Sequence, residues 1–188
     1  MRDLAAASDG ELAALAGHAA TAQAAYRALM DRHRAAAFRL ARHHCGNDDA
    51  ALDVTQQSFI AAFAALHRYD PARPFFHWLA RIVLNKSRDW ARRRKVHRLL
   101  TFARPIEDAH DLAACTPDPE REVADRQQLT RALAAVVRLP TRLKDVLVLR
   151  TLDGMTQTET AALLGITEKA VETRLYRARA KLSEMLRD

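Results

Sequence analysis

The chain has 188 residues, of which 49% are hydrophobic, so it is long enough for one medium-sized domain or two small domains with a buried core. Much of this hydrophobic content is alanine, and no run of alternating β-branched residues indicates a strand, so we expect an all-α protein. Thirty basic residues against 23 acidic residues give a net charge of +7, which favours a polyanionic partner.

Several classes of protein are disfavoured by the same sequence. No apolar stretch approaches the roughly 20 residues needed to span a bilayer, and there is no signal-peptide pattern, so we expect a cytoplasmic protein without membrane insertion. The two cysteines, Cys45 and Cys115, lack Cys-x-x-Cys spacing, which favours reduced thiols. We find no nucleophile–base set, phosphate-binding glycine loop or spaced carboxylate pair, and therefore expect neither an enzyme nor a cofactor.

Helical periodicity begins near the N-terminus. Residues 9–20 should form a first helix with Asp9 as its N-cap. A longer helix should follow over residues 22–45, because apolar residues recur there at intervals of three and four and Gly46 ends the pattern.

A third helix is predicted over residues 49–67, capped by Asp48 or Asp49. Its expected buried stripe consists of Leu52, Phe59, Phe63 and Leu66. A neighbouring face carries the polar residues Asp49, Asp53, Gln56 and Gln57. From the sequence alone, this polar face is either a docking surface or a plain solvated face.

Prolines at 71 and 74 break the helical pattern, and a fourth helix should start at Phe75 and continue to about Arg98. Its end, residues 86–98, has seven basic residues and one acidic residue. Such a run repels itself unless an anion neutralises it, so we predict contact with a nucleic-acid backbone, although a membrane surface could also accept the charge.

The character of the sequence changes after this helix. Residues 101–125 contain seven acidic residues, three prolines and little apolar periodicity, which is typical of a linker. We therefore predict two small helical domains, residues 1–99 and 126–188, joined by a flexible acidic linker over residues 100–125.

The C-terminal residues 156–182 have the pattern of a helix-turn-helix. Thr156 and Glu159 form a capping-box signature, Gly165 suits a sharp turn, and Thr167 can cap the second helix. Side chains expected to point inward are Ala161, Ala162, Leu164, Ile166, Val171, Leu175, Ala178 and Leu182.

The outer face of this last helix is polar and basic. It presents Lys169, Glu172, Thr173, Tyr176 and Arg177, with Arg174 nearby. This pattern favours a helix that enters a DNA groove, and the plainer alternative is a solvated amphipathic helix in a bundle.

In this order the elements resemble the extracytoplasmic-function (ECF) group of bacterial RNA polymerase sigma factors, within the sigma-70 family. The resemblance covers nearly the whole chain. Its carriers are DVTQQSF at residues 53–59, YDPARPFFHWLARIVLNKSRDWARRRK at 69–95, LPTRLKDVLVLR at 139–150 and the helix-turn-helix ending ETRLYRARAKL.

The resemblance assigns roles to residues in the first half of the chain. It implies that Asp53, Gln56 and Gln57 dock on the clamp of core RNA polymerase, with Gln57 standing where a carboxylate is common. It also implies that residues 69–94 recognise and melt the minus-ten promoter element. The residues expected at this element are Phe76, His77 and Asn85 at a base pocket and Arg88, Arg92 and Arg93 on phosphates, whereas Trp78 is expected in the core.

In the second half, the resemblance implies that the helix-turn-helix binds the minus-thirty-five element as duplex DNA. The residues matched to this role are Lys169, Glu172, Thr173, Arg174, Tyr176 and Arg177. It further implies contact with the β flap as well as the β′ clamp of the polymerase, passage of the linker through the polymerase channels, and control by an anti-sigma factor.

Two alternatives remain. His43, His44 and Cys45, with His33 earlier in the helix, suggest a metal sensor, but adjacent helical side chains diverge and no second pair completes four ligands, so we expect no metal. An independent regulator of duplex DNA would use the same C-terminal helices but needs no clamp-docking face and no melting helix.

Overall fold

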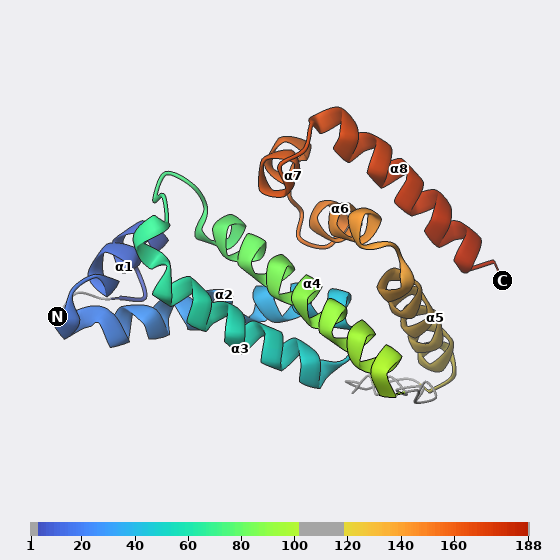
Figure 1. Cartoon of the computed structure of the whole chain (residues 1–188), viewed down its shortest axis with the longest axis horizontal. Helices are drawn as coiled ribbons and strands as arrows, with labels where there is room; N and C mark the ends of the chain where they lie inside the picture. The colour runs from blue at the N-terminus through green and yellow to red at the C-terminus, as the bar shows by residue number, and fades with distance from the viewer. Residues whose placement is uncertain (1–3, 102–118, 188) are drawn as a thin grey trace.

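The computed structural model describes residues 4–101 and 119–187, with side chains given for residues 4–97 and 128–187. All the regular secondary structure in this part of the chain is helical, which confirms the all-α prediction (Figure 1). The elements are α1 (Asp9–Ala16), α2 (Ala19–Cys45), α3 (Asp48–Ala64), the short 3₁₀ helix η1 (Leu66–Arg68), α4 (Phe75–Thr101), α5 (Pro119–Arg138), α6 (Thr141–Thr151), α7 (Gln157–Leu164) and α8 (Glu168–Met185).

Helices α2, α3 and α4 pack side by side, and α1 lies across one end of them (Figure 1). The fully buried side chains of this bundle include Leu12, Leu29, Leu40, Val54, Phe75 and Leu79. The prediction that Leu52 is buried was wrong, because its side chain is 59% exposed. The buried stripe of α3 instead runs through Ala51, Val54, Ser58, Phe59 and Ala62, whose mostly small side chains allow the neighbouring helices to approach.

Two helix caps differ from the sequence prediction. Ser8, not Asp9, caps α1 and forms a capping box with Glu11, so the signature lay one residue earlier than expected. The Asp9 carboxylate instead receives hydrogen bonds from Arg32 at 2.6 Å and His33 at 2.9 Å, which tie α1 to α2. Asn47, rather than Asp48 or Asp49, caps α3, and these two aspartates lie in the first turn where the helix dipole favours negative charge.

The helix-turn-helix is α7 and α8, and its predicted local geometry is confirmed. Thr156 and Glu159 form the capping box of α7, Gly165 adopts the left-handed conformation with φ 66°, and the Thr167 side chain caps α8. The stripe on α8 is also confirmed, since Val171 and Ala178 are fully buried. Ala162 is exposed, contrary to prediction, because Leu163 takes the inward position.

Helix α5 begins at Pro119 and therefore includes residues 119–125, which the sequence had assigned to the linker. Proline suits the first turn of a helix, where its missing N–H would have no helical partner. The rest of the predicted linker from residue 102 to 118 lies outside the described residues.

The two helical units pack against each other and share one apolar core. That core joins α2–α4 residues to Val136, Leu139, Leu147, Val148, Leu149, Met155 and Leu163. Gly46, at the end of α2, has φ 84°, and a Cβ atom there would lie only 2.9 Å from Val137 Cγ1 of α5. The glycine therefore serves both the left-handed turn and the close approach of the second unit.

Candidate nucleic-acid interface

One face of α4 presents a row of polar and basic side chains. His77, Arg81, Asn85, Arg88 and Arg92 follow one another at intervals of four, four, three and four residues, so they project from the same side of the helix. The α4 face, defined by these five residues, contains four of the six residues predicted for the minus-ten element.

The α4 face is hollowed where α7 lies against it. A cavity of about 160 Å³ is lined by Arg81, Asn85 and Arg88 of α4 and by Leu163 and Leu164 of α7. Within it, Arg88 Nη1 donates to Asn85 Oδ1 at 3.3 Å. The side chain of Asn85 offers both a donor and an acceptor, which is the chemistry that reads the edge of a base.

A second cavity, of about 330 Å³, continues along the start of α4. His77 lies in it with its Nε2 3.9 Å from Glu159 Oε1 of α7. The α4 face therefore meets α7 at two places, near His77 and near Asn85.

The aromatic residues beside the α4 face pack against the core, although only Phe75 is fully buried. Trp78 packs against Tyr69 and Phe75, with ring centroids 5.6 Å from each, but it is only half-buried and also lines the second cavity, so the core prediction holds in part. Phe76 is half-buried, and its ring lies 6.4 Å from that of His33 on α2. The structure thus places Phe76 next to α2. It does not bring Phe76 together with Asn85 and the other predicted minus-ten residues.

A buried carboxylate connects the α4 face to the second unit. Asp145 of α6 accepts hydrogen bonds from Arg88 Nη2 at 2.5 Å and from His44 Nε2 of α2 at 2.9 Å. The side chains of Asp145 and His44 are each only 4% exposed. Burial alone would raise the pKa of Asp145, but hydrogen bonding to His44 and the Arg88 guanidinium hold this pKa below its ordinary value.

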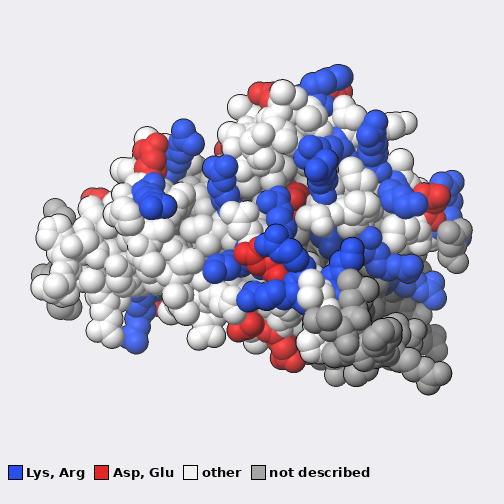
Figure 2. All heavy atoms as spheres, viewed as in Figure 1, with Lys and Arg blue, Asp and Glu red and all other residues white. Residues whose placement is uncertain are grey.

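On the face drawn in Figure 2, basic side chains gather over two parts of the molecule. Figure 2 shows lysines and arginines over α4 and over the second unit, whereas the end at α1 is mostly uncharged. The remaining predicted arginines, Arg92 and Arg93, are exposed toward the end of α4, and Arg92 is paired with Asp89 of the same helix. This distribution suits contact with an extended polyanion.

The outer face of α8 is solvent-exposed. Tyr176 is 75% exposed, Glu172, Thr173 and Arg177 are also exposed, and Arg174 is half-buried. Lys169 Nζ donates to Glu172 Oε2 at 2.9 Å. Since Val171 and Ala178 hold the opposite side in the core, the α8 face is free to enter a groove.

The predicted docking residues lie on the outer side of α3. Asp53 and Gln56 are exposed, and Gln57 Nε2 donates to Asp53 Oδ2 at 3.1 Å. Leu52 and Ile60, on the same side, are 59% and 64% exposed. This mixture of apolar and polar groups is typical of a protein-binding surface.

Comparisons with known proteins agree with this arrangement. Residues 29–97 match the model of the Sigma-70 region 2 family, and residues 126–182 match that of Sigma-70, region 4. The sigma factor CnrH of Cupriavidus metallidurans is 43% identical over 176 residues, which cover 92% of each chain. The ECF sigma factor SigM of Mycobacterium tuberculosis is 34% identical over 95% of this chain and 85% of SigM.

The chain belongs to the ECF group of sigma-70 RNA polymerase sigma factors. Sigma factors are regulatory proteins of transcription initiation. The solved structure of CnrH in complex with the cytosolic domain of CnrY is also similar, with a TM-score of 0.68, 38% identity, and coverage of 95% of this chain and 96% of that one. In this sigma factor, α2–α4 correspond to region 2 and α5–α8 to region 4.

The histidines considered as metal ligands have other partners in the sigma factor. His43 Nδ1 lies 2.6 Å from Arg39 O, and His44 Nδ1 lies 2.9 Å from Leu40 O. Cys45 is buried, and burial raises the pKa of its thiol to about 11. Within the residues that the structure describes, no group of three potential ligand side chains converges, and no helix is long and apolar enough to cross a membrane.

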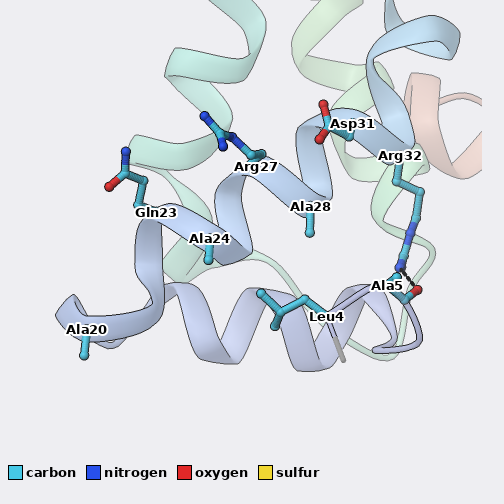
Figure 3. A pocket seen from close by; sticks show the side chains of 9 residues that line it. All are labelled: Leu4, Ala5, Ala20, Gln23, Ala24, Arg27, Ala28, Asp31 and Arg32. Atoms are coloured by element: carbon cyan, nitrogen blue, oxygen red, sulfur yellow. Dashed lines mark hydrogen bonds between the residues drawn. The ribbon is translucent and has the colours of Figure 1, made fainter. Parts of the chain in front are cut away.

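A wide hollow of about 890 Å³ lies at the other end of region 2, between the N-terminal segment and α2 (Figure 3). Much of its lining is alanine, including Ala20, Ala24 and Ala28. Its charged residues are Arg27, Asp31 and Arg32, of which Arg32 is already bonded to Ala5 O at 3.2 Å and to Asp9. Small side chains alone do not define a ligand site.

Sequence reasoning missed three residues at the contact between regions 2 and 4. His44 had been weighed only as a metal ligand, Asp145 had no role, and Arg81 had not been singled out. Among local signals, only the charged pair Lys144-Asp145 within an otherwise apolar run pointed to Asp145, since a buried charge requires a partner.

Proposed function

We propose that this sigma factor binds core RNA polymerase, directs it to promoters with minus-ten and minus-thirty-five elements, and helps to open the DNA. One observation supports the proposal. The same chain has a basic face with a cavity on region 2 and a separate exposed face on the helix-turn-helix of region 4. The residues of the sigma factor assist promoter opening by binding alone. The protein is therefore not expected to be an enzyme or to need a cofactor.

The α3 surface is the proposed docking site for the polymerase clamp. Asp53 and Gln56 supply the polar contacts, while exposed Leu52 and Ile60 supply apolar area. Gln57, bonded to Asp53, fixes the carboxylate and replaces a possible ion pair by a neutral amide. A surface ion pair contributes only about 0–1 kcal/mol, so this replacement is compatible with docking.

The α4 face is the proposed minus-ten site. A base that leaves the stack loses stacking and pairing, and therefore needs a pocket that bonds its edge while cations hold the separated backbone. Asn85 provides the edge contacts, and Arg88, Arg92 and Arg93 provide the cations. His77 borders the pocket, whereas Phe76 acts through packing at the start of α4.

The α8 face is the proposed minus-thirty-five site. Arg177 can bond guanine with two donors and Glu172 can accept from cytosine, so the face has the means to distinguish bases. Lys169, Thr173, Tyr176 and Arg174 complete it through phosphate, sugar or apolar contacts. Region 4 is also the part proposed to meet the polymerase β flap.

An anti-sigma factor is a further proposed partner. CnrH, 43% identical to this chain, has been solved in complex with the cytosolic domain of CnrY. We therefore expect a protein of that kind to cover the polymerase- and DNA-binding faces until a signal releases it. Because this proposed role is on the polymerase, we expect the sigma factor to act in the cytoplasm.

Association with core RNA polymerase tests the docking part of the proposal. The full chain should co-elute with polymerase core that lacks any sigma, and Asp53→Arg should weaken this association. Asp31→Arg, a matched change at an exposed position of α2, should not. If the folded chain fails to bind core but shifts particular duplexes on its own, an independent helix-turn-helix regulator replaces the sigma function.

A further inference from the structure

We propose that the bond between Asp145 and Arg88 is an autoinhibitory latch: in the free protein, region 4 lies against the α4 face, and Asp145 occupies the place of a DNA phosphate on Arg88. This inference rests on the proposed use of the α4 face for promoter DNA. It adds a closed state that DNA must open.

The DNA-contacting groups of the α4 face are engaged inside the protein. Arg88 donates to Asp145 at 2.5 Å through Nη2 and to Asn85 at 3.3 Å through Nη1. A carboxylate and a phosphate offer the guanidinium the same kind of charged oxygen acceptor. The same Arg88 nitrogen cannot hold Asp145 and a phosphate in the same position, so the two acceptors compete.

Helix α7 also borders the face on one side. Leu163 and Leu164 line the cavity that contains Asn85 and Arg88, and Leu163 is only 8% exposed. At the start of α4, Glu159 lies 3.9 Å from His77. Asn85 is itself exposed, so α7 restricts the approach of a DNA strand from its own side of the face and leaves the other side open.

The chemistry of the latch allows it to open. Both partners of the Asp145 carboxylate, His44 and Arg88, come from region 2, so separation of the regions breaks both bonds together. Separation also returns the carboxylate to water, which offsets much of the lost attraction, because a buried ion pair roughly breaks even against its desolvation. The Arg88 side chain is already 40% exposed, so an incoming phosphate can approach it.

The latch is tested with Asp145→Asn in the full chain. Asp48→Asn is the matched control, because it removes the same charge from an ion pair with Arg42 in which the carboxylate is 52% exposed and makes no bond to Arg88. Small-angle scattering should show a larger radius of gyration for Asp145→Asn than for the wild type. If the latch keeps about nine molecules in ten closed, the affinity for a pool of random 12-nucleotide single strands should rise roughly tenfold. The control should change neither quantity.

Two outcomes would overturn the proposal: an unchanged radius of gyration, or an opened chain with unchanged affinity for single strands. A second test is needed if Asp145→Asn loses helicity.

This test uses Ala162, which is exposed and lines the second cavity with Arg73 and Arg81. Ala162→Arg should open the chain by like-charge repulsion, and Ala162→Glu should keep it closed. Equal radii of gyration for the two variants would contradict the latch. Neither scattering test involves polymerase, so loss of core binding by every variant would refute the sigma function separately.

Discussion

Arg88 of α4 and Asp145 of α6 are 57 residues apart in the sequence, yet Arg88 Nη2 donates to Asp145 Oδ2 at 2.5 Å. The carboxylate of Asp145 is almost completely excluded from water. Because Arg88 also belongs to the proposed minus-ten face, we expect one residue to take part both in the packing of region 4 on region 2 and in contact with DNA. The architecture and the function of the sigma factor are therefore linked at this bond.

Removal of the buried carboxylate should destabilise the folded chain. Asp145→Ala removes the acceptor that His44 and Arg88 share, and a buried polar group such as the His44 ring nitrogen that is left unsatisfied typically costs about 1–3 kcal/mol. Urea unfolding monitored by circular dichroism should show this loss. Asp48→Ala, at a surface pair, should cost at most about 1 kcal/mol, and an equal loss in both variants would contradict the special role of Asp145.

Asp153, between α6 and α7, should make stability depend on pH. Burial raises the pKa of this carboxyl from 3.8 to about 6, and its Oδ2 atom has no hydrogen-bond partner. The folded chain therefore holds the proton more tightly than the unfolded chain, so the stabilising contribution is complete below about pH 4 and is lost as pH rises to about 6.

Asp153→Asn should remove this dependence. At pH 7.5 the variant should be more stable than the wild type, by up to about 3 kcal/mol if the whole pKa change is recovered. At pH 4.5 the difference should fall to about 1 kcal/mol. Urea unfolding at both pH values measures how much more stable Asp153→Asn is than the wild type. A smaller gain at pH 7.5 than at pH 4.5 would count against the proposed pKa change.

Two glycines allow the stability lost through a steric clash between the regions to be distinguished from the stability lost through backbone strain. Gly46 and Gly165 both have positive φ, 84° and 66°, so alanine at either position should cost about 1–2 kcal/mol. Only at Gly46 would the new Cβ meet another residue, at 2.9 Å from Val137 Cγ1. Gly46→Ala should thus lose about 1–3 kcal/mol more than Gly165→Ala in the same unfolding experiment; equal losses would show that Val137 moves aside freely.

Region 2 and region 4 should have separable effects on promoter use. Asn85→Ala should impair promoter opening or minus-ten selection while leaving core binding intact, because the amide acts on a splayed base. Arg177→Ala should mainly weaken recognition of the minus-thirty-five duplex, by about 1–3 kcal/mol if a bidentate base contact is lost. Permanganate footprinting and duplex binding distinguish the two effects. An equal loss of core binding in both folded variants would be incompatible with this division.

Local sequence signals were sufficient where a few neighbouring residues determine the structure. The capping box at Thr156 and Glu159, the turn at Gly165 and the stripe through Val171 all follow from short-range spacing. Ser8 and Glu11 carried the same signature for α1, although Asp9 had been preferred.

The remaining features depend on which helices meet. Leu52 and Ala162 were assigned to the core from periodicity, but the direction of the core is set by neighbouring helices that a single helix does not reveal. His44 and Asp145 are 101 residues apart, so their bond has no local signal. The acidic composition of the predicted linker likewise indicated two separate domains. It gave no sign that α5 and α6 pack on α2.

Transcription by reconstituted polymerase tests the central claim most directly. Core RNA polymerase lacking any sigma, supplied with the full chain and a library of promoter fragments, should initiate at fragments that share a two-part sequence. The same reaction without the chain should not select them. A folded chain that binds core but directs no promoter-specific initiation would contradict the proposed function.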